Sequence, residues 1–409
     1  MANALLTIDM ITREAVRLFK NSNLFIQNLD TQYDSAFAVD GAKIGTALRI
    51  RLPNDYVVND GPAMQLQDTT EQYTTLNVSS QKNVSVPFTT AERTMSLDDY
   101  GERVMAPIIN NLAGKVAATV MGAAEDACNL TYNADGAGNL ISPTSQQFLQ
   151  ANAILDDNSA DMMTRNMVND PTTDARTTVS LQGLFNPTPE ISQQFRTGMM
   201  KSGLGFDKWF RDQTVIKHTV GSFNAGGTVN LGAQTGTSIN VNAITGTLKK
   251  GDIITFANVN AVNRVTKQSL GTLRQFVVTA DQLTAATAIP IYPALIPSAT
   301  GLAGGPDVQY QTVDASPING AAMLLVLPAG TVYRKSLAYV KKAITMATAD
   351  LVLPRKAVEE AGRAEYDGIS MRVLTDYLPG TDQLATRVDV LFGYKTLRPE
   401  WLCACADII

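Results

Sequence analysis

The sequence contains few of the side chains that most often build catalytic or metal sites. Its 409 residues include only three cysteines and one histidine. Three scattered cysteines do not make a disulfide framework, which indicates a protein made and used in a reducing compartment. Structural zinc takes four ligands, usually in paired cysteine or histidine spacings, so the composition also gives little support to a zinc site.

Charge is scarce as well. Asp, Glu, Lys and Arg make up 17% of the chain, and the formal net charge is −5. A general nucleic-acid binder would show a clustered basic excess, and no basic stripe stands out, so that class of function is disfavoured. A surface with so few charges must be covered by other polar residues or by burial against copies of the same chain.

Long apolar runs are missing too. No stretch approaches the roughly 20 apolar residues that a membrane span needs, so no membrane association is expected. Residues 1–20 lack the basic start, apolar run and cleavage site of a secretory signal. Instead, Ile11, Ala15, Val16 and Phe19 fall on one side of a helical pattern, which predicts an amphipathic helix.

A long hairpin is predicted after this helix. Residues 48–52 alternate between apolar side chains and arginines, which is typical of a strand with one charged face. A turn cluster at residues 59–62 follows, and a second alternating run extends from Leu76 to Phe88. Such a hairpin is marginal alone in water, so it should pack on another element or another subunit.

The strongest helix signal covers SLDDYGERVMAPIINNLAGKVAATVMGAAEDACNL, which is residues 96–130. Ser96 is a good N-cap, and apolar residues recur every four positions from Val104 to Ala124. An unbroken helix of this length would extend about 50 Å. Pro107 removes one internal hydrogen bond and predicts a kink or a restart. Such a helix would serve as a spine across which several elements pack.

The length of the chain predicts two or three domains, and its composition changes once. Residues 219–248 carry no charge and combine β-branched residues with Gly and Asn, which is typical of antiparallel β structure. We therefore predict an all-β module inserted into a mixed α/β domain. Around it we expect helices at 145–158 and 189–200, a buried strand at 177–187, strands at 371–379 and 386–401, and either a helix or a buried strand at 336–348.

Few residues suggest chemistry. Cys403 and Cys405 form a C-x-C pair, but residues two apart on a strand share one face, so we interpret both thiols as small packing residues. His218 has no nucleophile motif beside it and is expected to be a hydrogen-bonded residue at the module boundary. The Gly-rich stretches lack the lysine of a phosphate loop. No enzyme site, cofactor or metal is predicted.

Four stretches together resemble a known family. They are GTALRIRLPNDY before a polar tip, SLDDYGERVMAPIINNLAGKVA, GTLKKGDIITFANVNAV in the inserted module, and the closing FGYKTLRPEWL. In this order they are similar to the coat proteins of short-tailed phages of the P22 type. The resemblance implies an α+β fold of the Hong Kong 97 capsid type that carries an all-β, immunoglobulin-like (telokin-like) insertion.

The resemblance also implies a division of the chain. The implied segments are an N-terminal arm (1–43), an extended loop (44–90), the spine helix with part of the peripheral domain (91–132), an axial domain (133–216), the inserted module (217–316), and the return through the axial and peripheral domains (317–409).

The implied function is that of a major capsid protein. Copies would assemble as pentamers and hexamers into an icosahedral shell around a scaffolding protein, in the cytoplasm of a bacterial host. The shell would expand as double-stranded DNA, bound without sequence specificity, enters through a portal protein; decoration proteins are further partners in such shells. The alternatives are another self-assembling phage protein of a tail tube or fibre and, with less support, a cytosolic enzyme with an accessory β domain.

Contacts between subunits are expected at a few charged residues. Arg49 and Arg51, on one strand face of the extended loop, should bind acidic residues of a neighbour, although a solvated strand face explains them equally well. A long acidic loop bridges capsomers in the best-known relative, but residues 221–246 carry no charge here. Ionic bridging by that loop is therefore not expected. The other residues assigned to contacts are Asp55 and Asp60 in the extended loop and Lys249, Lys250 and Asp252 in the module.

Overall fold

A computed structural model of the chain describes residues 8–33, 47–52, 73–89, 105–180, 202–298, 308–354, 358–381 and 383–409, with a few single positions between them. The chain folds into two units. The first contains residues 1–52, 73–120 and 344–397, and the second contains residues 53–72, 121–343 and 398–409. Within the described residues, no helix is both long and apolar enough to cross a membrane.

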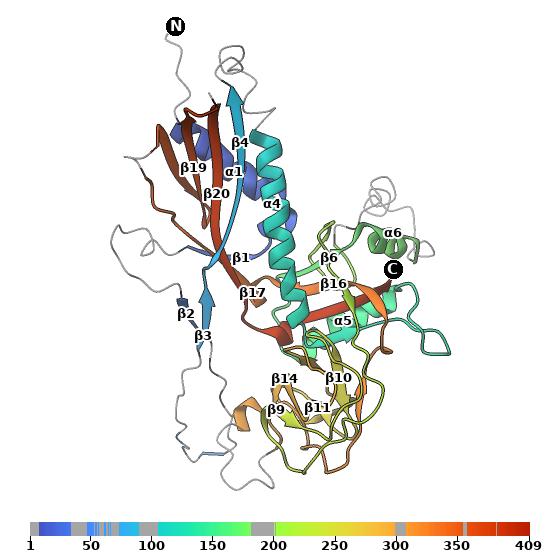
Figure 1. The fold of residues 1–409 in the computed structure, drawn as a ribbon. Coiled ribbons are helices and arrows are strands. Elements are labelled where there is room, and N and C mark those ends of the chain that lie inside the picture. Colours follow the sequence, from blue (N-terminus) through green and yellow to red (C-terminus); the bar gives the residue numbers. More distant parts are fainter. Residues whose placement is uncertain are drawn as a thin grey trace. The chain divides into compact units, whose positions relative to one another are not determined.

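The first unit is built on a six-stranded sheet with the order β1-β17-β20-β19-β18, in which β4 also pairs with β20. Ten residue pairs join β4 and β20 in an antiparallel ladder from Thr89–Gln383 to Ser80–Phe392. The three strands β4, β19 and β20 lie side by side (Figure 1). The strands are β1 (Asp30–Tyr33), β4 (Ser80–Thr89), β17 (Ile344–Ala349), β18 (Glu360–Tyr366), β19 (Ile369–Leu378) and β20 (Gln383–Thr396).

Helices pack on this sheet. The predicted amphipathic helix is confirmed as α1 (Ile8–Ser22), which buries Ala15, Val16 and Phe19. It packs on β18, on β19 and on α4 (Ala106–Val120), and the short helix α2 (Leu24–Gln27) follows it. The apolar stripe of α4 is also confirmed, because Ile108, Leu112, Val116 and Val120 are all buried.

The spine helix is shorter than predicted at its carboxyl end. The described α4 contains 15 residues, or about 22 Å at 1.5 Å per residue. It has Pro107 in its first turn, but Ser96 and Val104 lie outside the described residues. The predicted helix through residue 130 is wrong, since a 3₁₀ turn, η3 (Met121–Asp126), and strand β5 (Asn129–Thr131) follow. Gly122 has a low helix propensity, and the residues that follow it pair with β21 as strand β5 instead of extending the helix.

The base of the predicted hairpin is present in the first unit. Strand β2 (Ala47–Arg51) pairs antiparallel with β3 (Tyr73–Asn77). Leu76 and Val78 are buried against Ala347 and Ala349 of β17, and Leu48 and Ile50 pack beside them. The apolar face of the hairpin base therefore packs on its own unit, while Arg49 and Arg51 are exposed on the other face.

Replacing Gly393 of β20 with alanine is expected to lower the free energy of unfolding by about 1–3 kcal/mol. A Cβ atom at this position would lie 2.1 Å from the carbonyl oxygen of Asn77 and 3.0 Å from Cα of Val78, so the backbone leaving β3 would have to move. Limited proteolysis should then cut the hairpin base faster. Gly380→Ala is the matched control, because nothing lies within 4 Å of the added Cβ there; equal behaviour of the two variants would contradict the prediction.

The second unit contains a six-stranded mixed sheet with the order β5-β21-β16-β6-β7, in which β8 also pairs with β16. Its strands are β5, β6 (Arg165–Asn169), β7 (Lys208–Arg211), β8 (Lys217–Thr219), β16 (Val332–Val340) and β21 (Leu402–Ile408). The segment 336–348, predicted as a helix or a strand, forms β16, a 3₁₀ turn η6 (Lys341–Ala343) and then β17 of the first unit. The predicted strands at 371–379 and 386–401 are confirmed as β19 and β20 up to Thr396, whereas Pro399–Trp401 form a 3₁₀ turn, η7.

Two helices belong to this sheet. The predicted helix at 145–158 is confirmed as α5 (Ser145–Asp157), which packs on β5 and β21. The predicted strand at 177–187 is wrong where it is described, because residues 177–180 complete helix α6 (Pro171–Ser180). The start signal was present in the sequence: the Asp170 carboxylate accepts from the backbone N–H of Thr172, and Pro171 follows it as the first helical residue. The helix predicted at 189–200 lies outside the described residues apart from Met200.

The inserted module forms a five-stranded sheet, β15-β10-β13-β14-β9, and a two-stranded sheet, β11-β12. Its apolar core includes Phe223, Ile254, Phe256 and Phe276 and extends to Met323. Strand β15 lies beyond the predicted boundary at residue 316 and pairs with β10. The strands are β9 (Gly236–Asn240), β10 (Ile253–Phe256), β11 (Asn260–Val262), β12 (Ser269–Leu273), β13 (Phe276–Val278), β14 (Ala288–Leu295) and β15 (Met323–Leu325), with a 3₁₀ turn, η5 (Val308–Tyr310).

Candidate functional site

Four ionisable side chains meet within the second unit where the module joins the six-stranded sheet. This junction cluster consists of Glu125 from η3, His218 from β8, Asp252 from the turn before β10, and Lys335 from β16. His218 Nε2 lies 2.8 Å from Asp252 Oδ1, and His218 Nδ1 lies 3.0 Å from Glu125 Oε2. Lys335 Nζ donates to Glu125 Oε2 at 3.3 Å and to the Gly251 carbonyl at 3.1 Å. The expectation of a hydrogen-bonded His218 at the module boundary is confirmed.

The junction cluster is almost closed to solvent. The side chains of Asp252 and Lys335 are 0% exposed, and that of His218 is 5% exposed. Burial lowers the pKa of His218, but hydrogen bonds to Asp252 and Glu125 outweigh it, and the net pKa is raised. Burial likewise raises the pKa of Glu125, yet Lys335 and His218 together hold it below its ordinary value. Both shifts favour the charged forms of the two groups.

A second set of polar contacts joins the module to the turn at Pro399–Trp401 and to β5. Glu400 accepts from Tyr292 Oη at 2.6 Å and from Arg264 Nη1 at 3.1 Å. The side chain of Gln275 donates to the Leu130 carbonyl at 3.0 Å and accepts from the Leu130 N–H at 2.6 Å, in the manner of a strand partner. Burial raises the pKa of Tyr292 well above its usual value, so its hydroxyl stays a donor. The module is thus fastened to the sheet at two separate places.

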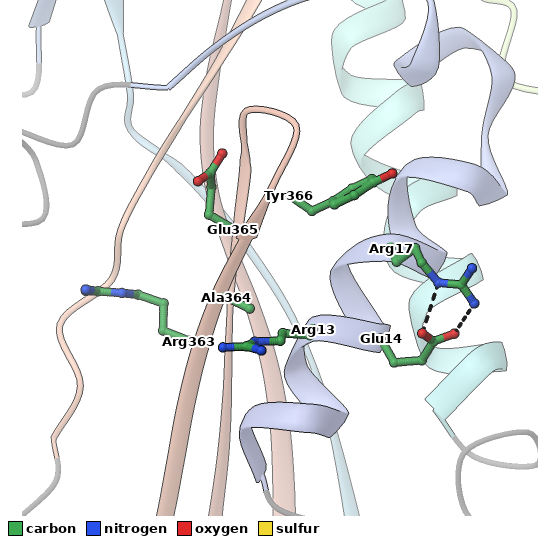
Figure 2. Close-up of a pocket in the computed structure, with 7 residues that line it drawn as sticks. All are labelled: Arg13, Glu14, Arg17, Arg363, Ala364, Glu365 and Tyr366. Atoms are coloured by element: carbon green, nitrogen blue, oxygen red, sulfur yellow. Dashed lines mark hydrogen bonds and ion pairs between the residues drawn. The ribbon is translucent and has the colours of Figure 1, made fainter.

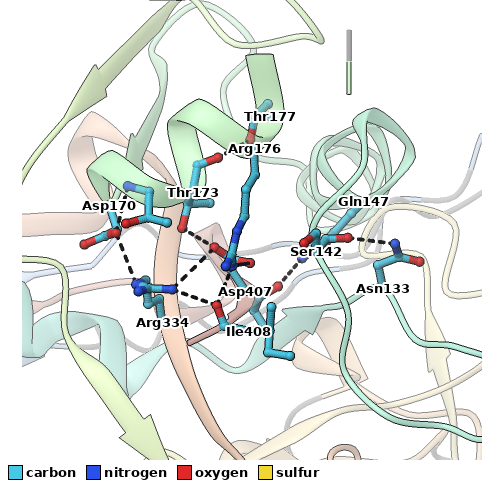
Figure 3. Close-up of polar contacts among 12 residues, drawn as sticks. Asn133, Ser142, Gln147, Asp170, Thr173, Arg176, Thr177, Arg334, Asp407 and Ile408 are labelled. Carbon is cyan, nitrogen blue, oxygen red and sulfur yellow. Dashed lines mark hydrogen bonds and ion pairs between the residues drawn. The ribbon is translucent and has the colours of Figure 1, made fainter. Parts of the chain in front are cut away.

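A third cluster surrounds Asp407 near the end of β21 (Figure 3). Its carboxylate accepts from Thr173 Oγ1 at 2.7 Å and from Arg176 Nη1 at 2.7 Å. Arg334 of β16 pairs with Asp170 at 3.2 Å and donates to the Ile408 carbonyl at 2.7 Å. These contacts fix α6 and the end of β21 to the centre of the sheet.

The cysteines of the C-x-C pair pack as predicted. Cys403 and Cys405 belong to one apolar cluster of the second unit with Phe148, Met167 and Trp209, and both thiols are buried. The neighbouring Cys405 thiol and burial raise the pKa of Cys403 well above its usual value, and burial raises the pKa of Cys128 to about 12. These are unreactive thiols, because the thiolate is the nucleophile and the metal ligand. Among the described residues, no group of three His, Cys, Asp or Glu could hold a metal ion.

The residues assigned to subunit contacts have different surroundings. On the exposed face of β2, the Arg49 guanidinium lies 4.0 Å from the centre of the Tyr73 ring, and Arg51 is next to it on the same face. Asp55 and Asp60 lie outside the described residues. The structure therefore presents two arginines of β2 together, and their contact with a neighbour stays a prediction.

The three module residues are held by contacts within the chain. Lys250 is 46% exposed and pairs with Asp126 at 2.8 Å, and its backbone N–H donates to Asp281. The backbone N–H of Lys249 donates to Asp252 at 2.7 Å. Asp252 also accepts from the Gly221 N–H at 3.0 Å, so its buried carboxylate serves the junction cluster and presents no surface to another subunit.

The first unit carries an open groove of about 680 Å³ between α1 and β18 (Figure 2). It is lined by Arg13, Glu14, Arg17, Arg363, Ala364, Glu365 and Tyr366. Arg17 donates to both carboxylate oxygens of Glu14, at 2.6 and 3.0 Å. Both α1 and β18 contribute arginine and glutamate side chains to the groove, and its described lining residues include no serine, cysteine or histidine.

Sequence reasoning missed Glu125, Lys335, Arg176, Arg334 and Asp407. Their partners are far apart in the chain; Lys335 and Glu125, for example, are 210 positions apart. The one available signal was a single charge inside an apolar run, as in LCACADII around Asp407. A charge predicted to lie in a buried strand requires a partner, but the sequence does not say which one.

The comparison with protein families decides the identity. A family model described as "P22 coat protein - gene protein 5" matches residues 41–404. The chain belongs to the P22 coat protein family. As a member it is the major capsid protein of a tailed phage, a structural component of the icosahedral shell of the virion and not an enzyme. The tail-tube, fibre and enzyme alternatives are not retained.

Several solved structures have a partly similar course of the chain. A chain of Mycobacterium phage Che8 has 9% identity and a TM-score of 0.45, covering 93% of this chain and 90% of that one. A chain of the bacteriophage PhiM1 mature capsid has 10% identity and a TM-score of 0.41, covering 92% and 85%. The I-domain of the CUS-3 coat protein has 21% identity and a TM-score of 0.20, covering 25% of this chain and 94% of that one. Since every score is below 0.5, the assignment to the P22 coat protein family depends on the sequence match alone. No curated protein sequence matches the chain.

Proposed function

We propose that this coat protein assembles as pentamers and hexamers, around a scaffolding protein, into a procapsid that expands when double-stranded DNA enters through a portal. We further propose that its fold is of the Hong Kong 97 type with an immunoglobulin-like insertion. The order of the described elements supports this: a hairpin base, a long helix, an α/β sheet and an inserted all-β module follow one another along the chain.

The division of the chain also belongs to the proposal. Residues 1–43 are the arm, 44–90 the extended loop, and 91–132 the spine with part of the peripheral domain. Residues 133–216 are axial, and the remainder after the module completes the axial and peripheral domains. The expected start of the module at residue 217 falls in β8, which pairs with β16 of the six-stranded sheet, so we place the start of the module after β8. We extend its end from residue 316 to Leu325 because β15 pairs with β10.

Electron microscopy of the purified protein tests the assembly proposal. Coat protein alone and coat protein co-expressed with a candidate scaffolding protein should differ, with closed polyhedral shells of uniform size in the second sample. Uniform shells from coat protein alone would overturn the role of scaffolding. Tubes or small oligomers in both samples would overturn the assembly pathway.

Reversing the charge at Arg49 and Arg51 together is expected to stop normal assembly and to leave soluble capsomers or aberrant shells. The two guanidinium groups lie on the exposed face of β2 and are proposed to bind carboxylates of a neighbouring subunit. Each contact contributes little free energy, but it is repeated in every subunit of the shell, so removing it weakens the whole assembly many times over. Sedimentation and negative-stain microscopy of Arg49→Glu/Arg51→Glu measure the outcome.

The matched control is Lys341→Glu/Lys342→Glu. These two lysines are exposed on the turn η6 and make no ion pair among the described residues, so the same change in net charge should leave assembly intact. Normal particles from the arginine variant would show that the face is merely solvated.

A further inference from the structure

The only histidine of the chain has a carboxylate at each ring nitrogen. His218 Nε2 is 2.8 Å from Asp252 Oδ1, and Nδ1 is 3.0 and 3.2 Å from the two Glu125 oxygens. A neutral imidazole has one N–H and one lone pair, so one nitrogen would direct a lone pair at a carboxylate oxygen. An imidazolium donates from both nitrogens and satisfies both carboxylates.

The charges around His218 lead to the same conclusion. Lys335 of β16 supplies one buried positive charge, and Glu125 and Asp252 supply two negative ones. With an imidazolium the cluster is neutral overall; with a neutral imidazole it retains one uncompensated negative charge in a largely buried site, which is strongly unfavourable. The aromatic neighbour is Tyr333, whose ring centroid lies 5.5 Å from that of His218. The other charged groups nearby are the partly exposed pair Lys250–Asp126, Lys217 on β8 and Lys249 on the module turn. Arg334 is engaged by Asp170 and Asp407.

The module turn approaches this cluster closely. Gly251 has a φ of +92°, and a Cβ atom there would lie 1.7 Å from Glu125 Oε2. Lys335 donates a hydrogen bond to the Gly251 carbonyl. The Asp252 carboxylate accepts from two backbone N–H groups, that of Gly221 at 3.0 Å and that of Lys249 at 2.7 Å. The position of the turn against the sheet thus depends on the charge balance of the cluster.

We propose that His218 is a buried imidazolium that forms a proton-dependent contact between the inserted module and the six-stranded sheet. Loss of its proton leaves the imidazole with a single N–H, so either Glu125 or Asp252 loses its donor and faces a lone pair, which loosens the turn at residues 249–252. The proposal concerns the single subunit and does not depend on the assembly pathway proposed above.

The direction of the pH dependence follows from the raised pKa of His218 in the folded chain. The contact contributes fully to stability below the ordinary histidine pKa of about 6.5 and is lost as the pH rises through the folded pKa. The junction is therefore expected to be strongest in mildly acid solution and to weaken on the alkaline side of the folded pKa.

Nitrogen NMR of the protein labelled with ¹⁵N-histidine tests the proposal directly, because a single histidine gives a single pair of ring nitrogens. The unassembled subunit should show both nitrogens protonated at neutral pH, with a titration midpoint above the ordinary value of about 6.5. A neutral tautomer at neutral pH, or a midpoint at or below the ordinary value, would overturn the proposal.

Hydrogen exchange measured by mass spectrometry tests the structural consequence. Exchange in peptides covering residues 247–256 should rise with pH more steeply than the intrinsic rate, whereas peptides covering β11 and β12 should follow the intrinsic rate. In His218→Gln, which cannot titrate, the excess pH dependence should vanish. The same excess in both proteins would overturn the assignment; if the variant does not fold, the NMR titration of the natural protein decides alone.

Discussion

Replacing Asp407 with alanine is expected to lower the free energy of unfolding of the second unit by about 3–5 kcal/mol, the range observed when one partner of a buried ion pair is removed. The Asp407 side chain is 0% exposed and accepts from Thr173 and Arg176. Its loss leaves the largely buried Arg334 with one carboxylate fewer and opens the contact between α6 and β21. Denaturant unfolding followed by tryptophan fluorescence measures the effect, because Trp209 and Trp401 both pack in the second unit.

Asp157→Ala is the control for this variant. Asp157 lies on α5 in the same unit and makes no ion pair among the described residues. Its replacement should change the unfolding free energy by no more than about 0.5 kcal/mol. If Asp407→Ala unfolded at the same denaturant concentration as Asp157→Ala, the Asp407 cluster would not be a major source of stability.

Asp252→Ala is expected to have an effect of similar size, also about 3–5 kcal/mol, through a different mechanism. The substitution removes the common acceptor of the Gly221 N–H, the Lys249 N–H and His218, all at the junction. Buried donors without an acceptor are costly, and the imidazolium loses one of its two carboxylates. We therefore expect both a lower unfolding midpoint and a lower His218 pKa by NMR.

Asp281→Ala supplies the comparison. Asp281 lies close by in the module and also accepts from a backbone N–H, that of Lys250 at 2.7 Å, but it is exposed. Water replaces its hydrogen bond, so a loss of about 1 kcal/mol or less is expected. A His218 titration unchanged in Asp252→Ala would contradict the geometry of the junction cluster.

Periodicity predicted the elements whose burial is local. The apolar stripe of α1 and the alternation in β2 each reflect one apolar face, and they appear in the structure where the pattern places them. Helix α6 was missed because its residues 171–180, PTTDARTTVS, are rich in threonine, which favours strands, while its start depends on a cap and a proline. The end of α4 was missed because pairing of β5 with β21 outweighs local helix propensity there.

The polar clusters could not be predicted, for a different physical reason. His218 and Glu125 are 93 positions apart, and Thr173 and Asp407 are 234 positions apart. A buried charge is stabilised by its partner in space, and neither composition nor spacing carries that information. The family resemblance, in contrast, depended on stretches spread through most of the chain, and the match to residues 41–404 confirms it.

The position of β21 determines when this sheet can fold as the chain emerges from the ribosome. Residues 402–408 pair with β5 on one side and with β16 on the other. On the ribosome both neighbours emerge before the strand that belongs between them. Strand β5 emerges more than 250 residues earlier, since the Thr131 hydroxyl donates a hydrogen bond to the Cys405 sulfur across 274 positions. Until then both would present open strand edges, which are sites of mispairing between nascent chains. The sheet can therefore close only after residues 402–408 have emerged, and subunits cut short before β21 would lack the strand that completes it.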